Sequence, residues 1–456
     1  CKWDNKNGIP CVEIKSTIAN VSKFANLNSK KTIITKRYIE NSGAIDLVDL
    51  LNKVPGIHIT QSGPAGQQTS LFMRGMGSNH TLVLINGVSI IDQSSTQGLF
   101  NFGADFIQTV QQIEIYQGSN GVHFGPNALA GAVNIITTGD LKDSVSISTA
   151  SNQNYNLSLN KSYITENNTL LNLKLGNANY KTTSARTNGK EEDGTKNLTG
   201  NFNLEKWIND NLRISNTVYL RQTITDYDGS SSDEHGYQND DKMGTLQFGL
   251  TNIKKNSEDN FKIYYNKYDR EYDEKNISDY YESNAFGIKY DSSKFINDFL
   301  SFGYGSEYRY DNGSFKNNGS YSASTKGHYD TVSGYSNLGI KFFDGLNLST
   351  FIRNDKNKRT GSNKTYKIDL EKQNEDFTFG VARMTGLRHP TIYELYGTDN
   401  YGYSGNKNLL SEKSTTNELY FNYNFFKNWS FGSTLFKSNI SDQISYTNNQ
   451  YINNKD

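Results

Sequence analysis

Apolar and polar positions follow two different patterns along this chain. Up to about residue 140 they predict short helices and short strands in mixed order: the stretch 46–54 places Leu47, Leu50 and Leu51 at helical spacing and is followed by Pro-Gly. From about residue 141 onward, apolar and polar residues alternate at period two in segments of about eight to eleven residues.

The alternating segments have the length that a tilted β-strand needs to cross a bilayer. Some connections between them are short, as in "FFDGLN", and others are long, as in "TDYDGSSSDEHGYQNDDK". Short turns on one rim and long loops on the other are typical of outer-membrane β-barrels. A propeller or solenoid would need a motif repeated at a fixed period, and we find none. We therefore expect a compact α+β domain followed by a barrel.

The stretch 70–88, "SLFMRGMGSNHTLVLINGV", contains two short apolar runs around a polar turn. A dinucleotide-binding loop would need a third glycine and a following helix, but position 80 is His80 and the next residues form an apolar strand that ends in Asn-Gly. The pattern predicts strand, turn and strand, which is a hairpin.

Composition narrows the class of protein. Apolar residues make up 34% of the chain and the mean hydropathy is -0.70. No run approaches the roughly 18 apolar residues of a spanning helix, which excludes a helical membrane protein. The 30 Tyr and 24 Phe suit the aromatic girdles of a barrel, although a secreted all-β protein would also fit this composition.

Charge and reactive residues exclude further functions. Lys+Arg and Asp+Glu both number 47, so no net field recruits nucleic acid. Cys1 and Cys11 leave open a disulfide, a lipidated N-terminus or a trimmed start. There is no His-x-x-x-His pair and no Gly-x-Ser-x-Gly motif. An outer-membrane hydrolase remains the alternative from another class, but neither it nor a passive porin would need the folded α+β domain that precedes the barrel.

Several ordered motifs resemble the TonB-dependent outer-membrane receptors. They are "DLLNKVPGI" (49–57), "FMRG" (72–75), "LVLINGV" (82–88), "VQQIEIYQG" (110–118), "FGPNALAGAVNIIT" (124–137) and, later, "LRHPTIYELYG" (387–397). The resemblance implies a transmembrane antiparallel β-barrel of 22 strands with an N-terminal α+β plug domain in its lumen, in the outer membrane of a Gram-negative bacterium. We expect a periplasmic segment over 1–29, the plug over 30–140 and the barrel over 141–456.

The barrel region departs from the family in length. It provides about 14 to 16 strands at the observed spacing, and family members continue for several more. We therefore expect a C-terminally incomplete chain, because an open barrel would leave unpaired strand edges in lipid.

The resemblance is nearest to the cobalamin receptors of the family, with ferric siderophore or haem receptors as the alternative. The expected ligand is cobalamin, another corrinoid or a metal chelate, and the other expected partners are TonB with its inner-membrane complex and outer-membrane lipid, without nucleic acid. Short polar side chains at the plug apex would match the amide edges of a corrinoid. The candidate ligand-binding residues are Gly66, Gln67, Gln68, Thr69, His80, Ser94, Ser95, Thr96 and Gln97.

Other family roles map onto single positions. Arg74, Glu114 and Glu418 are the candidates for locking the plug in the barrel, with Arg74 facing Glu418. A second arginine that the family often carries in the plug is replaced by Gln117, so one cation of the expected buried cluster is missing. The TonB-coupling segment falls around Val12, Glu13 and Ile14, an extended stretch suited to strand addition.

Two long loops carry many carboxylates. Calcium takes six to eight oxygen ligands, and flexible acidic loops can wrap it, although a solvated loop would have the same composition. Cobalamin receptors bind calcium in matching loops, so the resemblance implies calcium as a structural cofactor here. The candidate ligands are Glu191, Asp193, Asp228, Asp240 and Asp241.

Overall fold

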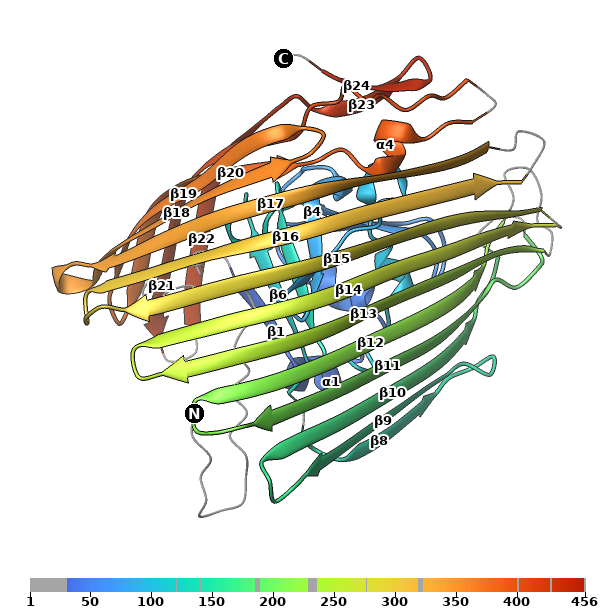
Figure 1. Cartoon of the computed structure of the whole chain (residues 1–456). Coiled ribbons are helices and arrows are strands. Elements are labelled where there is room, and N and C mark those ends of the chain that lie inside the picture. The colour runs from blue at the N-terminus through green and yellow to red at the C-terminus, as the bar shows by residue number, and fades with distance from the viewer. Residues whose placement is uncertain are drawn as a thin grey trace.

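The computed structural model describes residues 31–119, 121–139, 141–184, 189–228, 236–275, 277–318, 323–399, 402–426 and 429–454. They form a small mixed domain and one large antiparallel sheet that curls around it (Figure 1). Within these ranges, no helix combines the length and the apolar character needed to cross a membrane.

The small domain, which we call the plug, is built on a five-stranded sheet in the order β1-β6-β7-β4-β5. Strands β4 and β7 run parallel, whereas the other neighbours are antiparallel. A separate pair, β2 and β3, lies beside this sheet. The elements are β1 Lys31–Thr35, α1 Lys36–Ser42, α2 Leu47–Leu51, β2 Ile57–Gln61, β3 Thr69–Met73, β4 Thr81–Ile85, β5 Val88–Ile90, β6 Gln112–Gln117, α3 Gly121–Phe124 and β7 Gly131–Ile136.

Helix α2 forms where the apolar spacing predicts it. The side chain of Asp46 caps its N-terminus by accepting a hydrogen bond of 2.9 Å from the backbone N–H of Asp49. Leu47, Leu50 and Leu51 are fully buried in the plug core, as the helical spacing implies. The helix is short because the chain turns at the Pro-Gly that follows.

The stretch 70–88 contains one hairpin, but not the one that its pattern suggests. Strand β3 pairs with β2, and β4 pairs with β5 and β7, so the predicted β3–β4 hairpin is wrong. Arg74 and Gly75 have φ of 54° and 74°, which turns the chain out of one sheet before β4 enters the other. The true hairpin joins β4 to β5 through Asn86 and Gly87, both with positive φ, as in a type I′ turn.

The large sheet contains 15 strands, each antiparallel to the next, from β8 to β22. They are β8 Ser144–Thr149, β9 Tyr155–Ile164, β10 Thr169–Lys181, β11 Gly194–Trp207, β12 Leu212–Asp226, β13 Tyr237–Lys254, β14 Ser257–Glu274, β15 Ile277–Phe295, β16 Leu300–Asn317, β17 Ala323–Lys341, β18 Leu346–Asn357, β19 Gly361–Gln373, β20 Phe377–Arg388, β21 Glu412–Phe426 and β22 Trp429–Ser441. Helix α4, Ile392–Tyr396, and the hairpin of β23 Ile444–Thr447 and β24 Gln450–Asn453 lie over its far end. The middle strands are longer than expected, with 19 residues in β15.

The curled sheet surrounds the plug, whose elements lie inside it in Figure 1. The plug sheet ends at Ile136 and the barrel sheet begins at Ser144, with the expected boundary between them. Strands β8 and β22 are the two edges of the barrel sheet. The plug core extends to the barrel wall through the buried side chains of Tyr219, Met243 and Tyr268.

Strands β10, β12 and β20, which precede the long connections 182–193, 227–236 and 389–411, all finish at one end of the barrel, and the connections at the other end are all short. Because the longer loops of such barrels are extracellular, we call this end the outer end. Along the strands, inward residues are buried against the plug while outward residues are exposed and often apolar, as Leu198 and Leu220 are. That outward apolar surface is the face that a barrel presents to lipid.

Candidate functional site

Two hollows lie between the plug and the outer ends of β12–β15. The first has a volume of about 360 Å³ and the second about 400 Å³. Gln68, Asn101 and Tyr272 line both hollows, so they form one recess that we call the outer recess. It lies towards the outer end of the barrel, beside the strand ends that lead into the long loops.

Most of the candidate ligand-binding residues line the outer recess. They are Gly66, Gln67, Gln68, Ser94, Ser95 and Thr96. Asp92 stabilises the segment 94–96, because its Oδ1 accepts hydrogen bonds from the backbone N–H and the hydroxyl of Ser94 at 2.9 and 2.6 Å. The plug side of the recess is therefore built from small polar side chains and backbone. Their contact with a ligand stays a prediction.

The structure corrects the placement of three other candidates. Thr69 is fully buried and its hydroxyl donates to the carbonyl of Gln67 at 2.9 Å. Gln97 lines neither hollow, and its backbone carbonyl accepts from Arg388 at 3.5 Å. His80 is 1% exposed and lies against the barrel. Thr69 begins strand β3, where adjacent residues face opposite sides, so it points away from the recess that Gln68 lines. His80 ends a 3₁₀ turn over Ser78–His80 and lies against Glu412 of the barrel.

The barrel side of the outer recess is a wall of tyrosines that the sequence analysis missed. Tyr268, Tyr272, Tyr281 and Tyr393 line it. The rings of Tyr272 and Tyr281 meet edge to face with centroids 5.8 Å apart. These residues alternate with polar ones in the sequence, but the alternation alone does not say which face of each strand looks inward.

Arg270 is the cation of this wall. Its guanidinium lies 5.8 Å from the centroid of the Tyr272 ring and 5.2 Å from that of Tyr281. The Nε atom also forms an ion pair of 2.8 Å with Asp92 of the plug. The positive charge is thus compensated, and the recess presents aromatic and neutral polar surface without an excess of positive charge.

Three of the five candidate metal ligands come together. Carboxylate oxygens of Glu191, Asp193 and Asp228 lie within 4.8 Å of one another, although they belong to two different loops. Ser184 donates a hydrogen bond of 3.1 Å to Asp228, which also lines the second hollow. Hard oxygen ligands at this spacing fit a calcium ion at the margin of the outer recess.

Asp240 and Asp241 do not belong to that cluster. Asp241 is buried and accepts from Arg221 at 2.8 Å, whereas Asp240 is bound by Gln222 and Lys242. Both lie in strand β13, where adjacent residues point to opposite faces of the sheet. Their placement as metal ligands is therefore corrected.

Arg74 connects the plug to the barrel wall. Its Nη1 lies 2.8 Å from Glu418, and both side chains are almost fully buried. The guanidinium also lies 4.7 Å from the centroid of the Phe436 ring. The expected partner is thus in place, and the locking role stays a prediction. Arg74 Nη2 and Glu418 Oε1 are buried without a hydrogen-bond partner among the described residues, as in a cluster that lacks one member.

The two remaining positions of this expected cluster lie within the plug. Glu114 forms an ion pair with Lys31 and accepts from Tyr116 and Asn134 at 3.0 Å each. These contacts join plug strands to one another, and the expectation that Glu114 helps to lock the plug to the barrel stays a prediction. Gln117 donates to the carbonyl of Pro55 at 2.7 Å.

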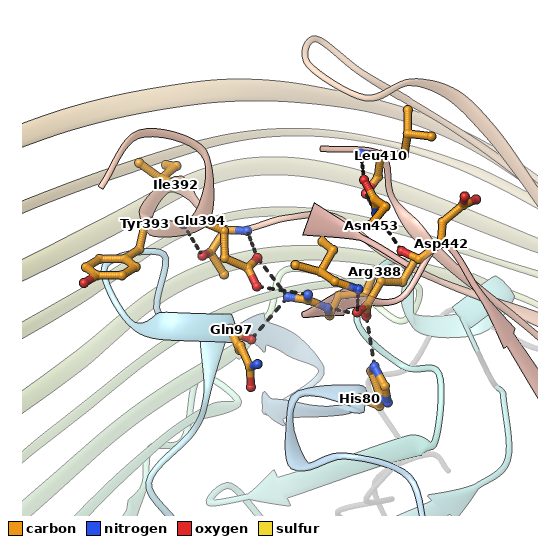
Figure 2. A network of polar contacts seen from close by, with 12 residues as sticks. His80, Gln97, Arg388, Ile392, Tyr393, Glu394, Leu410, Asp442 and Asn453 are labelled. Atoms are coloured by element: carbon orange, nitrogen blue, oxygen red, sulfur yellow. Dashed lines mark hydrogen bonds and ion pairs between the residues drawn. The ribbon is translucent and has the colours of Figure 1, made fainter. Parts of the chain in front are cut away.

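A second buried charge network joins the plug and the barrel to helix α4 and strand β23, and the sequence analysis did not identify it. Arg388 donates to Glu412 at 2.6 Å and to both oxygens of Glu394 at 3.1 Å. Glu412 also lies 2.9 Å from Nε2 of His80 and accepts from the backbone N–H of Ile444 at 2.7 Å. Figure 2 shows Arg388 between Glu394 and His80, beneath α4.

The candidate TonB-coupling residues Val12, Glu13 and Ile14 lie outside the described residues, as do Cys1 and Cys11. The site that the structure describes therefore comprises the outer recess, the carboxylate cluster beside it and two buried junctions between plug and barrel.

Two family models match the chain. The TonB-dependent receptor plug domain matches residues 24–132, and the TonB-dependent receptor-like β-barrel matches residues 100–456. Among curated proteins, the chain is 26% identical to the vitamin B12 transporter BtuB of Photobacterium profundum over 425 residues, which cover 89% of this chain and 64% of that protein. It is 37% identical to the protein of the same name from Vibrio vulnificus over 115 residues, 25% of this chain and 18% of that protein. The chain thus spans less than two thirds of the length of these relatives.

Solved structures share the fold. The siderophore receptor PirA from Acinetobacter baumannii superposes with a TM-score of 0.76 at 17% identity, covering 91% of this chain and 71% of that one. A mutant of the ferric enterobactin receptor PfeA from Pseudomonas aeruginosa gives 0.76 at 16% identity, covering 94% and 77%. At this identity the likeness concerns architecture alone.

Proposed function

Because the chain belongs to the family of TonB-dependent receptors, which are outer-membrane β-barrels of Gram-negative bacteria, we propose that it takes up cobalamin or another corrinoid. The observation that carries the proposal is its similarity to proteins named vitamin B12 transporters, which extends over 89% of the chain in one case. The family is one of receptors, so uptake is favoured over the alternative of an outer-membrane hydrolase.

The chemistry of the outer recess supports a ligand with neutral polar edges. Gln68 and Thr96 offer amide and hydroxyl groups that can both donate and accept hydrogen bonds. Arg270 is already paired with Asp92, so the described residues that line the recess leave no free cation to attract an anionic chelate. A corrinoid, whose rim carries amides, matches this lining.

Calcium is part of the proposal. Glu191, Asp193 and Asp228 would hold the ion, and its charge would offset the repulsion between three clustered carboxylates. Because Asp228 also lines the recess, the ion would order the loops that border the ligand. The ion supplies structure here and takes no part in a reaction.

Energy for transport would come from TonB at the inner membrane, since the outer membrane has no nucleotide or ion gradient of its own. The ligand would bind in the outer recess while the plug closes the barrel. The plug would then have to shift, which requires changes at the Arg74–Glu418 and His80–Glu412 contacts. These residues hold the closed state and do not touch the ligand.

A ferric siderophore is the second candidate, because the tyrosine wall would also suit an aromatic chelate. The rings of Tyr272 and Tyr281 face the recess beside Arg270. The wall alone does not distinguish the two ligand classes, since rings also pack against the apolar faces of a corrin. The compensated charge of Arg270 favours the neutral ligand.

Equilibrium binding to the intact purified receptor tests the assignment. We expect cyanocobalamin to bind and Gln68→Ala to weaken that binding about threefold to tenfold through the loss of a ligand hydrogen bond. Gln97→Ala is the matched control, because the same side chain there lines neither hollow. Tight binding of a ferric siderophore without binding of cyanocobalamin would contradict the corrinoid proposal and favour the siderophore as the ligand.

A further inference from the structure

The outward face of β19–β22 carries a shallow groove of about 610 Å³. We call it the β19–β22 groove. Its floor is aliphatic, with Ile368, Leu370, Val381, Leu419 and Leu435, and these side chains are exposed on the outside of the barrel. It lies outside the barrel lumen and is unrelated to the outer recess.

The end of this groove nearer the outer loops is cationic. Arg383 of β20 is in register with Asn417 of β21, and Asn417 is in register with Lys437 of β22. All three line the groove, and both cations are exposed. A row of polar groups with two positive charges therefore crosses three strands at one level.

The opposite end of the same face is aromatic, which fixes the depth of the cations. Phe421, Tyr423, Phe425 and Trp429 form a continuous series with ring centroids 6.3, 5.7 and 6.5 Å apart. Such girdles mark a membrane interface. From Trp429 to Lys437 a strand tilted by about 40° rises roughly 20 Å, against an apolar belt about 25 Å tall. The cations therefore lie close to the outer interface, where lipid headgroups begin.

Arg383 binds neutral groups. Arg383 donates to the hydroxyl of Tyr366 at 3.0 Å and to the amide oxygen of Asn417 at 3.1 Å. Among the described residues, no ion pair includes Arg383 or Lys437. The described residues therefore leave this charge uncompensated at the edge of an apolar surface, where an anion would be attracted strongly.

A second outward groove provides a comparison within the same molecule. It has a volume of about 550 Å³ and an aliphatic floor that includes Leu175, Leu198 and Leu220. Its two lysines are compensated by carboxylates: Lys242 lies 2.7 Å from Asp240, and Lys267 lies 3.7 Å from Asp269 and 3.6 Å from Glu282. Both grooves have apolar floors and cations towards the outer end, but of the two only the β19–β22 groove has cations without a carboxylate partner among the described residues.

We propose that the β19–β22 groove is a binding site for a phosphate-bearing lipid of the outer leaflet. An acyl chain lies along the aliphatic floor, and a headgroup phosphate is bound by Arg383 and Lys437. Guanidinium binds phosphate through charge-assisted hydrogen bonds with fixed geometry, and the ammonium adds a point charge. The occupant is a lipid, because a free phosphate would leave the aliphatic floor without a partner.

Native mass spectrometry of the intact receptor, released from detergent with added lipid A, tests the site. The double variant Arg383→Gln with Lys437→Gln should retain about tenfold less lipid A than the unmodified receptor, since each interfacial cation contributes to the attraction of an anionic headgroup. The matched control is Lys242→Gln with Lys267→Gln in the other groove, which should retain lipid A normally. Lys437→Gln alone provides the measurement if the double variant is not recovered folded.

Two further probes separate a lipid site from other origins. Dephosphorylated lipid A should bind the unmodified receptor as weakly as lipid A binds the double variant, and millimolar inorganic phosphate should not displace lipid A. Equal retention by the double variant, equal loss in the control variant, or displacement by inorganic phosphate would each overturn the proposal.

Discussion

At the scale of single residues, a buried ion pair joins the plug to the barrel wall. Arg74 and Glu418 are 2% and 1% exposed and meet at 2.8 Å, so each is the main compensation for the other. A surface pair such as Lys161 and Asp143 remains largely solvated instead. Removing one partner of a buried pair leaves an uncompensated charge, which costs far more than losing a surface pair.

Glu418→Gln should therefore loosen the plug by about 3 kcal/mol, whereas Lys161→Gln should change its stability by less than about 1 kcal/mol. Hydrogen exchange of the β3 amides in the intact receptor measures the effect. The apolar pair Arg74→Met with Glu418→Leu should recover most of the protection, because no charge then remains buried. Equal protection in Glu418→Gln and the unmodified receptor would show that this contact does not hold the plug.

Asp46 makes the stability of the plug depend on pH. Burial raises the pKa of this carboxyl to about 6, from an ordinary value of 3.8. Between these two values the folded plug keeps a proton that the unfolded chain releases. The contribution of Asp46 is thus fully present below about pH 4 and is lost as the pH rises to about 6, by roughly 2 to 3 kcal/mol in total.

Asp46→Asn should remove this pH dependence and keep the helix cap, since an amide oxygen also accepts from Asp49. Asp46→Ala, the control, also lacks the carboxyl and should be about 1 kcal/mol less stable than Asp46→Asn at every pH because the cap is gone. Protection of the α2 amides, corrected for the intrinsic effect of pH on exchange, reports both outcomes. If the stability of Asp46→Asn still depends on pH in this range, another titratable group is responsible for the dependence.

At the scale of elements, two loops form one acidic site. The connection between β10 and β11 provides Glu191 and Asp193, and the end of β12 leads to Asp228. Neither loop alone brings the three carboxylates together. A bound cation should therefore order both loops at once.

Calorimetry on the intact receptor should detect calcium, and Asp228→Ala should weaken its binding by about tenfold or more through the loss of a charged ligand. Asp240→Ala should bind calcium like the unmodified receptor, because Asp240 is held by Gln222 and Lys242. Calcium binding that is unaffected by Asp228→Ala would show that this carboxylate cluster is not the calcium site.

At the scale of the whole molecule, the plug lies inside the curled sheet and contacts its wall at many points. The hydroxyl of Thr223 donates to the carbonyl of Ala104 at 2.7 Å, which joins β12 to the plug. The same Thr223 lies opposite Asn197 of the neighbouring strand. A cysteine at position 223 can therefore be cross-linked either to the plug at position 104 or to the neighbouring barrel strand at position 197.

A thiol cross-link between Ala104→Cys and Thr223→Cys should stop uptake of cyanocobalamin while leaving its binding intact, because the plug can no longer shift. Asn197→Cys with Thr223→Cys ties two strands of the wall and should leave uptake unchanged. Reduction of the first cross-link should restore uptake. Normal uptake with the plug tethered would show that transport needs no displacement at this point.

Much of this protein is determined by its sequence. Period-two alternation places apolar side chains on one face of each strand, and the antiparallel barrel sheet follows from it. The pattern around Leu47, Leu50 and Leu51 fixes helix α2, and Asn86-Gly87 fixes the turn after β4. Polar residues at 66–68 and 94–96 reach the outer recess as expected. These features depend on neighbours along the chain, which the sequence contains.

Only the tertiary structure decided which distant residues meet. His80 and Glu412 are 332 positions apart, and their contact depends on how the plug docks against β21. Strands β3 and β4 entered different sheets because the turn at Arg74 redirects the chain. The tyrosine wall and the groove of Arg383 and Lys437 depend on the register between strands. Alternation fixes the face of each side chain, but register and docking, which arise from long-range packing, fix its neighbours.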